Sequence, residues 1–293
     1  MAPHPFERID DDTISAWILL TPALLLLSLF VFWPILYLFY LSFTTGSFTR
    51  EGVQWIGLQN YQRLLIDPDF WQVIKNTVYF SLATLLPSLG IPLGLAILLN
   101  QNLALRGLLR TAYFIPSITS LVAVGLGFRW LFQVDGPVNH LLSPLGVAPI
   151  NWLSSTTWAM PVLIILTTWK QIGFNMVVFL AGLQTIPTNR YEAAELDGAD
   201  NWGQFWHITL PGLQPTLIFT AITTALFTLR SFEQVYVITG GGPLNSTNIL
   251  VYYIYEQAFA QFDFGYAAAA AAILLTFALL LTYIQLQLGK SDA

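Results

Sequence analysis

The stretch YEAAELDGADNWGQFWHITLPGLQP, residues 191–215, interrupts a chain that is otherwise dominated by apolar residues. Four acidic residues lie close together in it, namely Glu192, Glu195, Asp197 and Asp200. Gly198 separates the last two, and an apolar run resumes at Leu210. An acidic segment between two apolar runs indicates a water-exposed turn that joins two elements which water does not solvate.

The composition of the whole chain points to a membrane. The chain has 293 residues, of which 55% are hydrophobic and only 9% charged, with a mean hydropathy of +0.63. Soluble domains carry about 25% charged residues, so we expect a bilayer as the solvent of this chain. A net charge of −5 without a cluster of Lys and Arg argues against a nucleic-acid partner. Cysteine is absent, which excludes disulfides and thiolate metal sites.

The apolar runs predict an all-α membrane protein. A membrane-spanning helix needs about 20 mostly apolar residues, and six stretches meet this requirement, at 15–43, 74–99, 109–132, 157–183, 212–237 and 264–287. We therefore expect six transmembrane helices in a single domain, residues 1–293, with both termini on one side of the membrane. In the last run, the alanines from Ala267 to Ala272 suit close helix packing, although alanine is also simply a good helix former.

Residues 188–211, which we call the acidic segment, favour two short helices between the fourth and fifth runs. The first half has good helix formers with acids in its early turns, where they complement the helix dipole. Gly198 can adopt a positive φ and end that helix, and Asp200 or Asn201 can cap the second one. Pro211 suits the first turn of the fifth span. Such a helix pair predicts a docking surface for a soluble partner, and an amphipathic loop without a partner is the alternative.

The same residues carry a resemblance to a known family. Their ordered pattern resembles the EAA loop of permease subunits of ATP-binding-cassette (ABC) importers, in particular the carbohydrate-uptake type of the maltose and glycerol-3-phosphate permeases. The pattern comprises Tyr191-Glu192-Ala193-Ala194, Asp197-Gly198-Ala199, Phe205, Ile208, Leu210-Pro211 and Pro215. Four further segments are similar to family segments, at 57–80, 106–120, 169–187 and 235–248, so the resemblance covers nearly the whole chain.

The resemblance implies a role for the acidic segment. In this family the EAA loop is a cytoplasmic coupling helix pair, which sits in a cleft on an ATP-hydrolysing subunit. The residues that would make this contact here are Glu192, Ala193, Ala194, Asp197, Gly198 and Ala199. The implied fold has six transmembrane helices, the coupling helix pair between the fourth and the fifth, and both termini in the cytoplasm.

The resemblance also implies an assembly in the inner membrane. The implied partners are a second permease subunit, a homologous and non-identical chain, together with two ATP-binding subunits that hold ATP and Mg and an extracytoplasmic substrate-binding protein. The chain itself should hold no cofactor and no metal, and it should not hydrolyse ATP. Its one Gly-Lys-Ser, Gly289-Lys290-Ser291, has Ile284 where a phosphate-binding loop requires glycine.

Charged residues inside apolar runs suggest a substrate cavity, because charge is costly in a bilayer. Lys170 lies halfway along the fourth run, and Arg230 and Glu233 lie in the outer half of the fifth. Arg230 and Glu233 are three residues apart, which predicts one shared helix face, and an ion pair that merely holds helices together is the alternative. The full predicted cavity set is Lys170, Gln171, Asn175, Arg230, Glu233, Gln234 and Tyr236.

Two segments are candidates for contact with the binding protein. Residues 44–71 are polar with interspersed aromatic residues, as in a segment that lies along a membrane surface. Residues 239–248 form a glycine-rich turn at the outer end of the fifth run, where the candidate contacts are Gly240, Gly241, Gly242, Pro243 and Asn245. The alternative is that both segments only connect spans.

The expected function is that of a permease subunit that imports a solute by alternating access. The resemblance implies a sugar, an oligosaccharide, a glycosyl-glycerol-type osmolyte or glycerol-3-phosphate as cargo. A solute channel that is not coupled to ATP hydrolysis and an integral-membrane enzyme are the alternatives. Neither of them explains the acidic segment.

Overall fold

A computed structural model describes residues 11–46, 52–101 and 105–288. In these residues all regular structure is helical, apart from one bridge pair between Thr44 and Trp55. The helices are α1 (Asp11–Leu27), η1 (Ser28–Phe32), α2 (Trp33–Ser42), α3 (Gln59–Ile66), α4 (Pro68–Asn100), α5 (Arg106–Ile118), α6 (Leu121–Leu131), α7 (Pro137–Leu142), η2 (Ser143–Leu145), α8 (Ala159–Thr185), α9 (Thr188–Leu196), α10 (Asn201–Gln204), η3 (Phe205–Thr209), α11 (Leu210–Gly212), α12 (Gln214–Leu229), η4 (Val235–Thr239), α13 (Leu250–Tyr255), η5 (Glu256–Ala260) and α14 (Phe264–Leu288).

Four helices in the described residues are long and apolar enough to cross a membrane. They are Ala16–Ser42, Pro68–Asn100, Ala159–Thr185 and Phe264–Ile284. Two further helix pairs pass the same test but are bent, by 95° between α5 and α6 and by 67° between Asn201–Gly212 and α12. The number of spans is therefore four, or six if each bent pair crosses the membrane as one unit. The predicted all-α membrane fold is confirmed.

The third predicted span, 109–132, is not one straight helix. The helix α5 ends at Ile118, Thr119 is extended with φ −72° and ψ 148°, and α6 leaves at a right angle. Pro116 lies in the last turn of α5, where its missing N–H and its ring weaken the helix. The sequence contained this signal, but proline alone does not decide between a kink and a complete break.

The fifth predicted span, 212–237, is also interrupted. The helix α12 ends at Leu229, and Arg230 is its C-cap. Helical structure resumes only at Glu233, two residues before η4 begins. The prediction that Arg230 and Glu233 share one helix face is therefore wrong. Helix propensity does not mark this break, since Arg, Ser and Phe all occur in helices.

The core lies where α4, α8 and α12 pack together. The helix α8 is the most buried candidate span, with 56% of its apolar window covered by protein. Near its end, Met176, Phe179 and Leu183 contact Ala96 and Leu99 of α4. Earlier in α8, Gly173 faces α5 so closely that a Cβ there would lie 2.2 Å from the carbonyl oxygen of Tyr113. Tight helix contact of this kind is what small residues permit in membranes.

The alanine run in α14 is packed as predicted. Ala269 and Ala270 have no exposed surface, and both join a cluster with Leu64, Val73 and Tyr253. The absence of side-chain bulk on α14 thus lets α3 and α13 lie directly against it.

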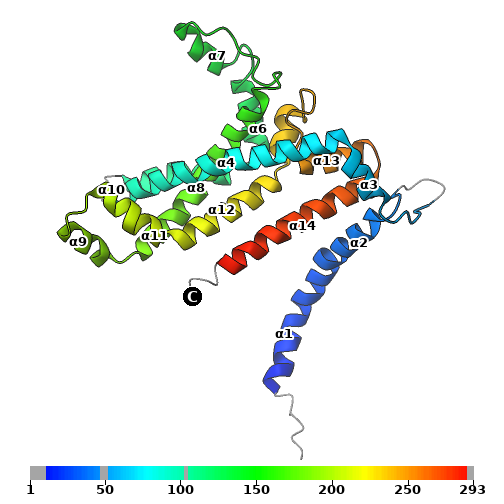
Figure 1. The fold of residues 1–293 in the computed structure, drawn as a ribbon, viewed down its shortest axis with the longest axis horizontal. Coiled ribbons are helices and arrows are strands. Elements are labelled where there is room, and N and C mark those ends of the chain that lie inside the picture. The colour runs from blue at the N-terminus through cyan, green and yellow to red at the C-terminus, as the bar shows by residue number, and fades with distance from the viewer. Residues whose placement is uncertain (1–10, 47–51, 102–104, 289–293) are drawn as a thin grey trace, which may run out of the picture.

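The long helices α4 and α8 give the molecule two ends (Figure 1). One end, which we call the α3 end, carries α3, the turn at 239–248 and α13, and α7 projects from the bundle beyond α6. The other, the α9 end, carries α9, α10 and α11 and lies beside Asn100, the last residue of α4. The acidic segment and the glycine-rich turn therefore lie at opposite ends of the bundle.

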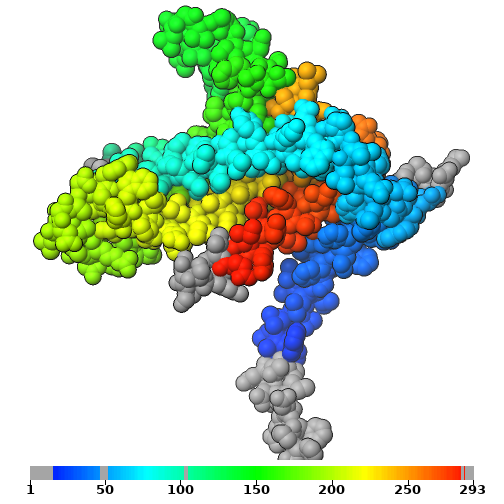
Figure 2. Space-filling view, in the orientation of Figure 1, coloured from blue at the N-terminus to red at the C-terminus, as the bar shows by residue number. Residues whose placement is uncertain are grey.

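The first span stands apart from the rest of the molecule. None of its apolar window is buried, and the space-filling view shows α1 projecting below the bundle without a neighbour (Figure 2). Its C-terminal part, α2, packs on α14 and is hydrogen-bonded to α3 through Ser42. Within this chain, nothing in the described residues covers α1.

Candidate functional site

A cavity of about 750 Å³ opens where two broken helices meet α8. We call it the broken-helix cavity. Its walls come from the break between α5 and α6, from α8 and from the last turns of α12 with the residues that follow. The lining residues are Ser117, Thr119, Leu121, Lys170, Thr223, Leu226, Phe227, Arg230, Ser231, Phe232, Glu233 and Gln234. Its volume falls within the roughly 300–1,000 Å³ of small-molecule pockets.

Lys170 lines this cavity and also binds the backbone at the break between α5 and α6. Its side chain is 8% exposed, and its ammonium donates a hydrogen bond to the carbonyl oxygen of Thr119, just beyond the end of α5. A cation at a helix C-terminus is stabilised by the helix dipole. Ser117 joins α5 to α8, because its hydroxyl donates to the carbonyl of Lys170 at 2.9 Å and accepts from the N–H of Phe174 at 3.2 Å.

Arg230 and Glu233 both line the cavity and are both exposed to it. They form no ion pair with each other; the ion pair found among the described residues joins Arg63 to Asp263. The alternative of a purely structural Arg230–Glu233 pair thus has no support in this geometry. Gln234 lines the cavity beside them, and its side-chain nitrogen has no hydrogen-bond partner within the described residues.

The other predicted cavity residues lie elsewhere. Asn175 is 1% exposed, and its amide nitrogen donates to the carbonyl of Ser88 at 2.7 Å and to the hydroxyl of Thr224 at 3.1 Å, so it joins α4, α8 and α12. Gln171 is buried in α8 and does not line the cavity. Tyr236 is half-exposed and stacks on Phe232, with ring centroids 5.3 Å apart.

The predicted cavity set lacks the lining residues from the break after α5 and from α12. Ser117 and Thr119 belong to the run Pro116-Ser-Ile-Thr-Ser, which combines a helix breaker with hydroxyls inside an apolar stretch. That combination was a usable signal for a polar break. Thr223 and Ser231 gave no comparable signal, since single hydroxyls occur throughout the apolar runs.

The acidic segment folds as the predicted pair of helices. The helix α9 ends at Leu196 with Asp197 as its C-cap, and Gly198 follows with φ +83°, a conformation that glycine adopts without strain. The side chain of Asp200 caps α10 by accepting from the N–H of Gly203 at 2.8 Å. Pro211 lies in the first turn of α11 rather than of α12, which begins at Gln214 after the 67° bend.

The exposed face of the acidic segment combines charge with apolar surface. Glu192, Ala193, Glu195, Asp197, Gly198 and Asp200 are all exposed, whereas Ala194 and Ala199 are half-buried. Leu196 is 90% exposed and Trp202 67% exposed, which is unusual for large apolar side chains on a water-facing hairpin. A hydrogen bond of 3.0 Å between the hydroxyls of Tyr191 and Thr209 joins α9 to η3. The helix pair is therefore a fixed unit that carries two exposed apolar side chains, Leu196 and Trp202, among carboxylates.

The glycine-rich turn is anchored at the opposite end. Gly240 and Gly241 have φ values of +57° and +78°. The amide of Asn76 on α4 donates to the carbonyls of Asn245 at 2.7 Å and Asn248 at 2.9 Å. Leu244, at the tip of the turn, is 86% exposed. Gln72 of α4 also donates to the carbonyl of Leu244 at 3.1 Å, so the turn is fastened to α4 along its length while the Leu244 side chain stays exposed.

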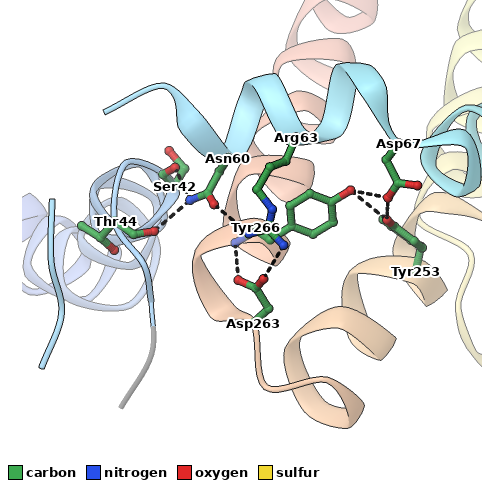
Figure 3. A network of polar contacts seen from close by, with 8 residues as sticks. All are labelled: Ser42, Thr44, Asn60, Arg63, Asp67, Tyr253, Asp263 and Tyr266. Carbon is green, nitrogen blue, oxygen red and sulfur yellow. Dashed lines mark hydrogen bonds and ion pairs between the residues drawn. The ribbon is translucent and has the colours of Figure 1, made fainter. Parts of the chain in front are cut away.

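Residues 44–71 are fastened to the last span by a polar network (Figure 3). The amide of Asn60 donates to the carbonyls of Ser42 and Thr44, which ties α3 to the end of the first span. Arg63 pairs with Asp263 at 2.9 Å and lies 4.5 Å from the ring centre of Tyr266.

Asp67, at the end of α3, accepts hydrogen bonds from two tyrosine hydroxyls, those of Tyr253 and Tyr266. Burial raises the pKa of Asp67, but the bonds from Tyr266 and Tyr253 outweigh it and hold the pKa below its ordinary value. The carboxylate therefore remains charged at the centre of this network.

Comparison with known proteins decides the family. Residues 87–291 match the model of the family described as "Binding-protein-dependent transport system inner membrane component". The chain belongs to this family. The resemblance inferred from the acidic segment is confirmed, and the chain is an ABC-transporter permease, a multi-pass protein of the inner membrane.

Relatives match this permease over almost its whole length. The lactose transport system permease protein LacF of Rhizobium radiobacter is 39% identical and covers 93% of each chain. The sulfoquinovosyl glycerol transport system permease protein SmoG of Agrobacterium fabrum is 37% identical, covering 96% of this chain and 92% of its own.

Solved structures match as well. A bacterial ABC transporter "involved in the import of the acidic polysaccharide alginate" has a chain that is 26% identical, with a TM-score of 0.82 and 97% of each chain covered. A second structure shows such a transporter in complex with an alginate pentasaccharide-bound periplasmic protein, with 26% identity, a TM-score of 0.81 and 95% of this chain covered.

Proposed function

We propose that this permease imports a sugar or a sugar-containing solute through the broken-helix cavity by alternating access, driven by ATP hydrolysis on separate partner subunits. The cargo class comprises a sugar, an oligosaccharide, a glycosyl-glycerol-type osmolyte or glycerol-3-phosphate. The names of the relatives, which include transporters of lactose and sulfoquinovosyl glycerol, support this class.

The observation that carries the proposal is the position of α12. One end of this helix joins the acidic segment through the 67° bend after Gly212, and its other end lines the cavity with Thr223, Phe227 and the C-cap residue Arg230. Its 16 residues span about 24 Å at 1.5 Å per residue. A displacement of the acidic segment would therefore reach the cavity through one bend and one helix.

The acidic segment is the proposed contact with an ATP-binding subunit. Its exposed apolar side chains, Leu196 and Trp202, would be desolvated in a partner cleft, and Glu192 would form charge-assisted hydrogen bonds at the rim. The contact residues in this proposal are Glu192, Ala193, Ala194, Asp197, Gly198 and Ala199. ATP and Mg would be held by two such partners, so the α9 end and both termini would face the cytoplasm. The first ten and last five residues, Gly289-Lys290-Ser291 included, lie outside the described part of the chain.

The α3 end would face the substrate-binding protein, with the turn at 239–248 as its contact. The proposed contact residues are Gly240, Gly241, Gly242, Pro243 and Asn245. A second, homologous permease would complete the assembly.

Inside the cavity, Arg230 and Glu233 have complementary roles. The guanidinium of Arg230 donates hydrogen bonds to the oxygen of a sugar hydroxyl, and the carboxylate of Glu233 accepts a hydrogen bond from its O–H. Transporters place polar groups inside the membrane by breaking helices at the binding site. Lys170 stays on the carbonyl of Thr119 and orients the wall rather than the cargo.

The test is co-purification of the tagged chain from its native membrane in mild detergent. Wild type should bring down an ATPase subunit, and Glu192→Lys should lose it. Asp135→Lys is the matched control, because Asp135 is an equally exposed acid beside α7, outside the acidic segment. If no ATPase accompanies wild type, or if both variants lose it alike, the docking argument fails and an uncoupled channel becomes the function to test.

A further inference from the structure

A second cavity, of about 670 Å³, lies at the α9 end. It is enclosed by the last turns of α4 and α8 on one side and by the acidic segment on the other. Five carboxamide side chains line it, those of Asn100, Gln101, Gln184, Asn201 and Gln204. We call it the amide cavity. It is almost as large as the broken-helix cavity and shares no lining residue with it.

The amides are largely free to bind a ligand. Gln204 donates one hydrogen bond, of 3.3 Å, to the carbonyl of Ala199. The side chains of Asn100, Gln101, Gln184 and Asn201 form no hydrogen bond with any residue that the structure describes. Two other polar lining residues, Tyr191 and Thr209, form a hydrogen bond with each other through their hydroxyls.

The chemistry of the lining selects a neutral polyhydroxy compound. No lining residue is charged, so a phosphate or a carboxylate would find no cation to pair with. Each carboxamide offers both an N–H₂ donor and a carbonyl acceptor, which matches the dual character of a sugar hydroxyl. Ile97, Ile186 and Phe205 add apolar walls for the C–H face of a sugar ring.

We propose that the amide cavity is a regulatory site that binds neutral sugar from the α9 side. It rests on the proposed function in one respect, since imported cargo is taken as the source of the sugar. A sugar in this cavity bridges two parts of the molecule, the ends of α4 and α8 and the hairpin that docks on the ATPase. Ligand binding stabilises the conformation of the protein in which the binding site is formed. Bound sugar therefore resists displacement of the acidic segment and slows ATP turnover when cargo accumulates inside.

The absence of cysteine from the chain allows a direct test. Thr188 lines the amide cavity and Thr223 lines the broken-helix cavity. Thr188→Cys and Thr223→Cys, each in the assembled importer in lipid nanodiscs, give one thiol per site. The measurement is the rate of maleimide labelling with glucose, lactose and trehalose as probes, and with glucuronate as the anionic match of glucose.

We expect a neutral sugar to slow labelling of Thr188→Cys, by about tenfold at about ten times its Kd, while glucuronate has little effect. Adding Gln101→Leu and Gln184→Leu should abolish this protection without changing the protection of Thr223→Cys. Gln261→Leu, an exposed amide outside the cavity, is the matched control. Unchanged labelling of Thr188→Cys by sugars that protect Thr223→Cys would overturn the site. Protection at neither position would instead overturn the proposed function.

Two further arms test the source and the effect of the ligand. A glucosyl lipid in the nanodisc, without free sugar, asks whether a lipid headgroup supplies the same hydroxyls; protection by that lipid alone overturns free sugar as the ligand. In the ATPase assay, glucose, lactose or trehalose should lower turnover of wild type and leave the Gln101→Leu/Gln184→Leu variant unaffected. Equal inhibition of both overturns the regulatory role.

Discussion

Lys170 shows how one charged side chain is accommodated in the middle of a spanning helix. Its ammonium is buried, and it donates to a carbonyl that the end of α5 leaves without a helical partner. The sequence indicated that Lys170 mattered, because charge at this depth is rare. It did not indicate the partner, since Thr119 lies 51 residues away in the chain.

Replacing Lys170 by Met should open the break between α5 and α6. We expect Lys170→Met to lower the free energy of unfolding by roughly 1–2 kcal/mol, because it leaves the carbonyl of Thr119 unpaired in an apolar surrounding. Titration with denaturing detergent measures the loss. Lys75→Met, which removes an exposed lysine on α4, is the control, and equal destabilisation by both would contradict this role.

Asp67 makes stability depend on pH at the α3 end. Its pKa is lowered in the folded chain, so its contribution is complete above the unfolded-state pKa of about 3.9 and is lost as pH falls through the folded-state pKa. The stability difference between wild type and Asp67→Asn should therefore be constant from neutral to mildly acidic pH and shrink below about pH 4. Unfolding midpoints across pH measure it, and a difference that grows in acid would contradict the prediction.

At the scale of the elements, local chemistry was predictable and tertiary breaks were not. Gly198 and Asp200 end and begin helices by interactions within their own turns, so the sequence alone identified them. The end of α12 at Leu229 depends on its neighbours in the fold, and no turn residue marks it. The same contrast holds for the candidate site. Charge identified three members of the broken-helix cavity, Lys170, Arg230 and Glu233. Of the four residues selected for polarity, Gln234 lines the cavity, whereas Gln171, Asn175 and Tyr236 lie outside its lining.

The crossing of α5 and α8 should tolerate no side chain at Gly173. A Cβ there would lie 2.2 Å from the carbonyl oxygen of Tyr113, which is backbone and cannot swing away. Gly173→Ala should therefore cost roughly 1–3 kcal/mol of stability through overpacking. Gly94→Ala in α4 is the matched control, since nothing lies within 4 Å of its added Cβ. Thermal unfolding of both variants decides the matter, and similar midpoints would show that the helices separate freely.

At the scale of the whole molecule, the two proposed interaction surfaces, the acidic segment and the glycine-rich turn, lie at opposite ends of one bundle (Figure 1). The sequence predicted this separation by counting spans, because an odd number of crossings separates the glycine-rich turn from the acidic segment. The structure adds that α4 and α8 connect the two ends without interruption (Figure 1). Effects at the two surfaces should therefore be separable by experiment.

Leu244→Glu should weaken docking of the binding protein and nothing else. Leu244 is exposed at the tip of a turn whose base is held by Asn76, so the change should leave the fold intact. We expect a severalfold higher concentration of binding protein for half-maximal ATP hydrolysis, with basal hydrolysis unchanged. Leu145→Glu, on η2 and 75% exposed, is the control. A change confined to basal hydrolysis would place the effect at the ATPase instead.

The first span is clamped near Ser42 by Asn60, while the rest of it extends away from the bundle with its apolar surface uncovered. In a bilayer the projecting helix enlarges the area over which other membrane proteins can first contact the chain. A larger target relaxes the orientation needed for a productive first collision, which raises the rate of association more than its strength. The exposed helix thus bears on how quickly newly made subunits find each other, and shortening it should delay assembly of the transporter in cells.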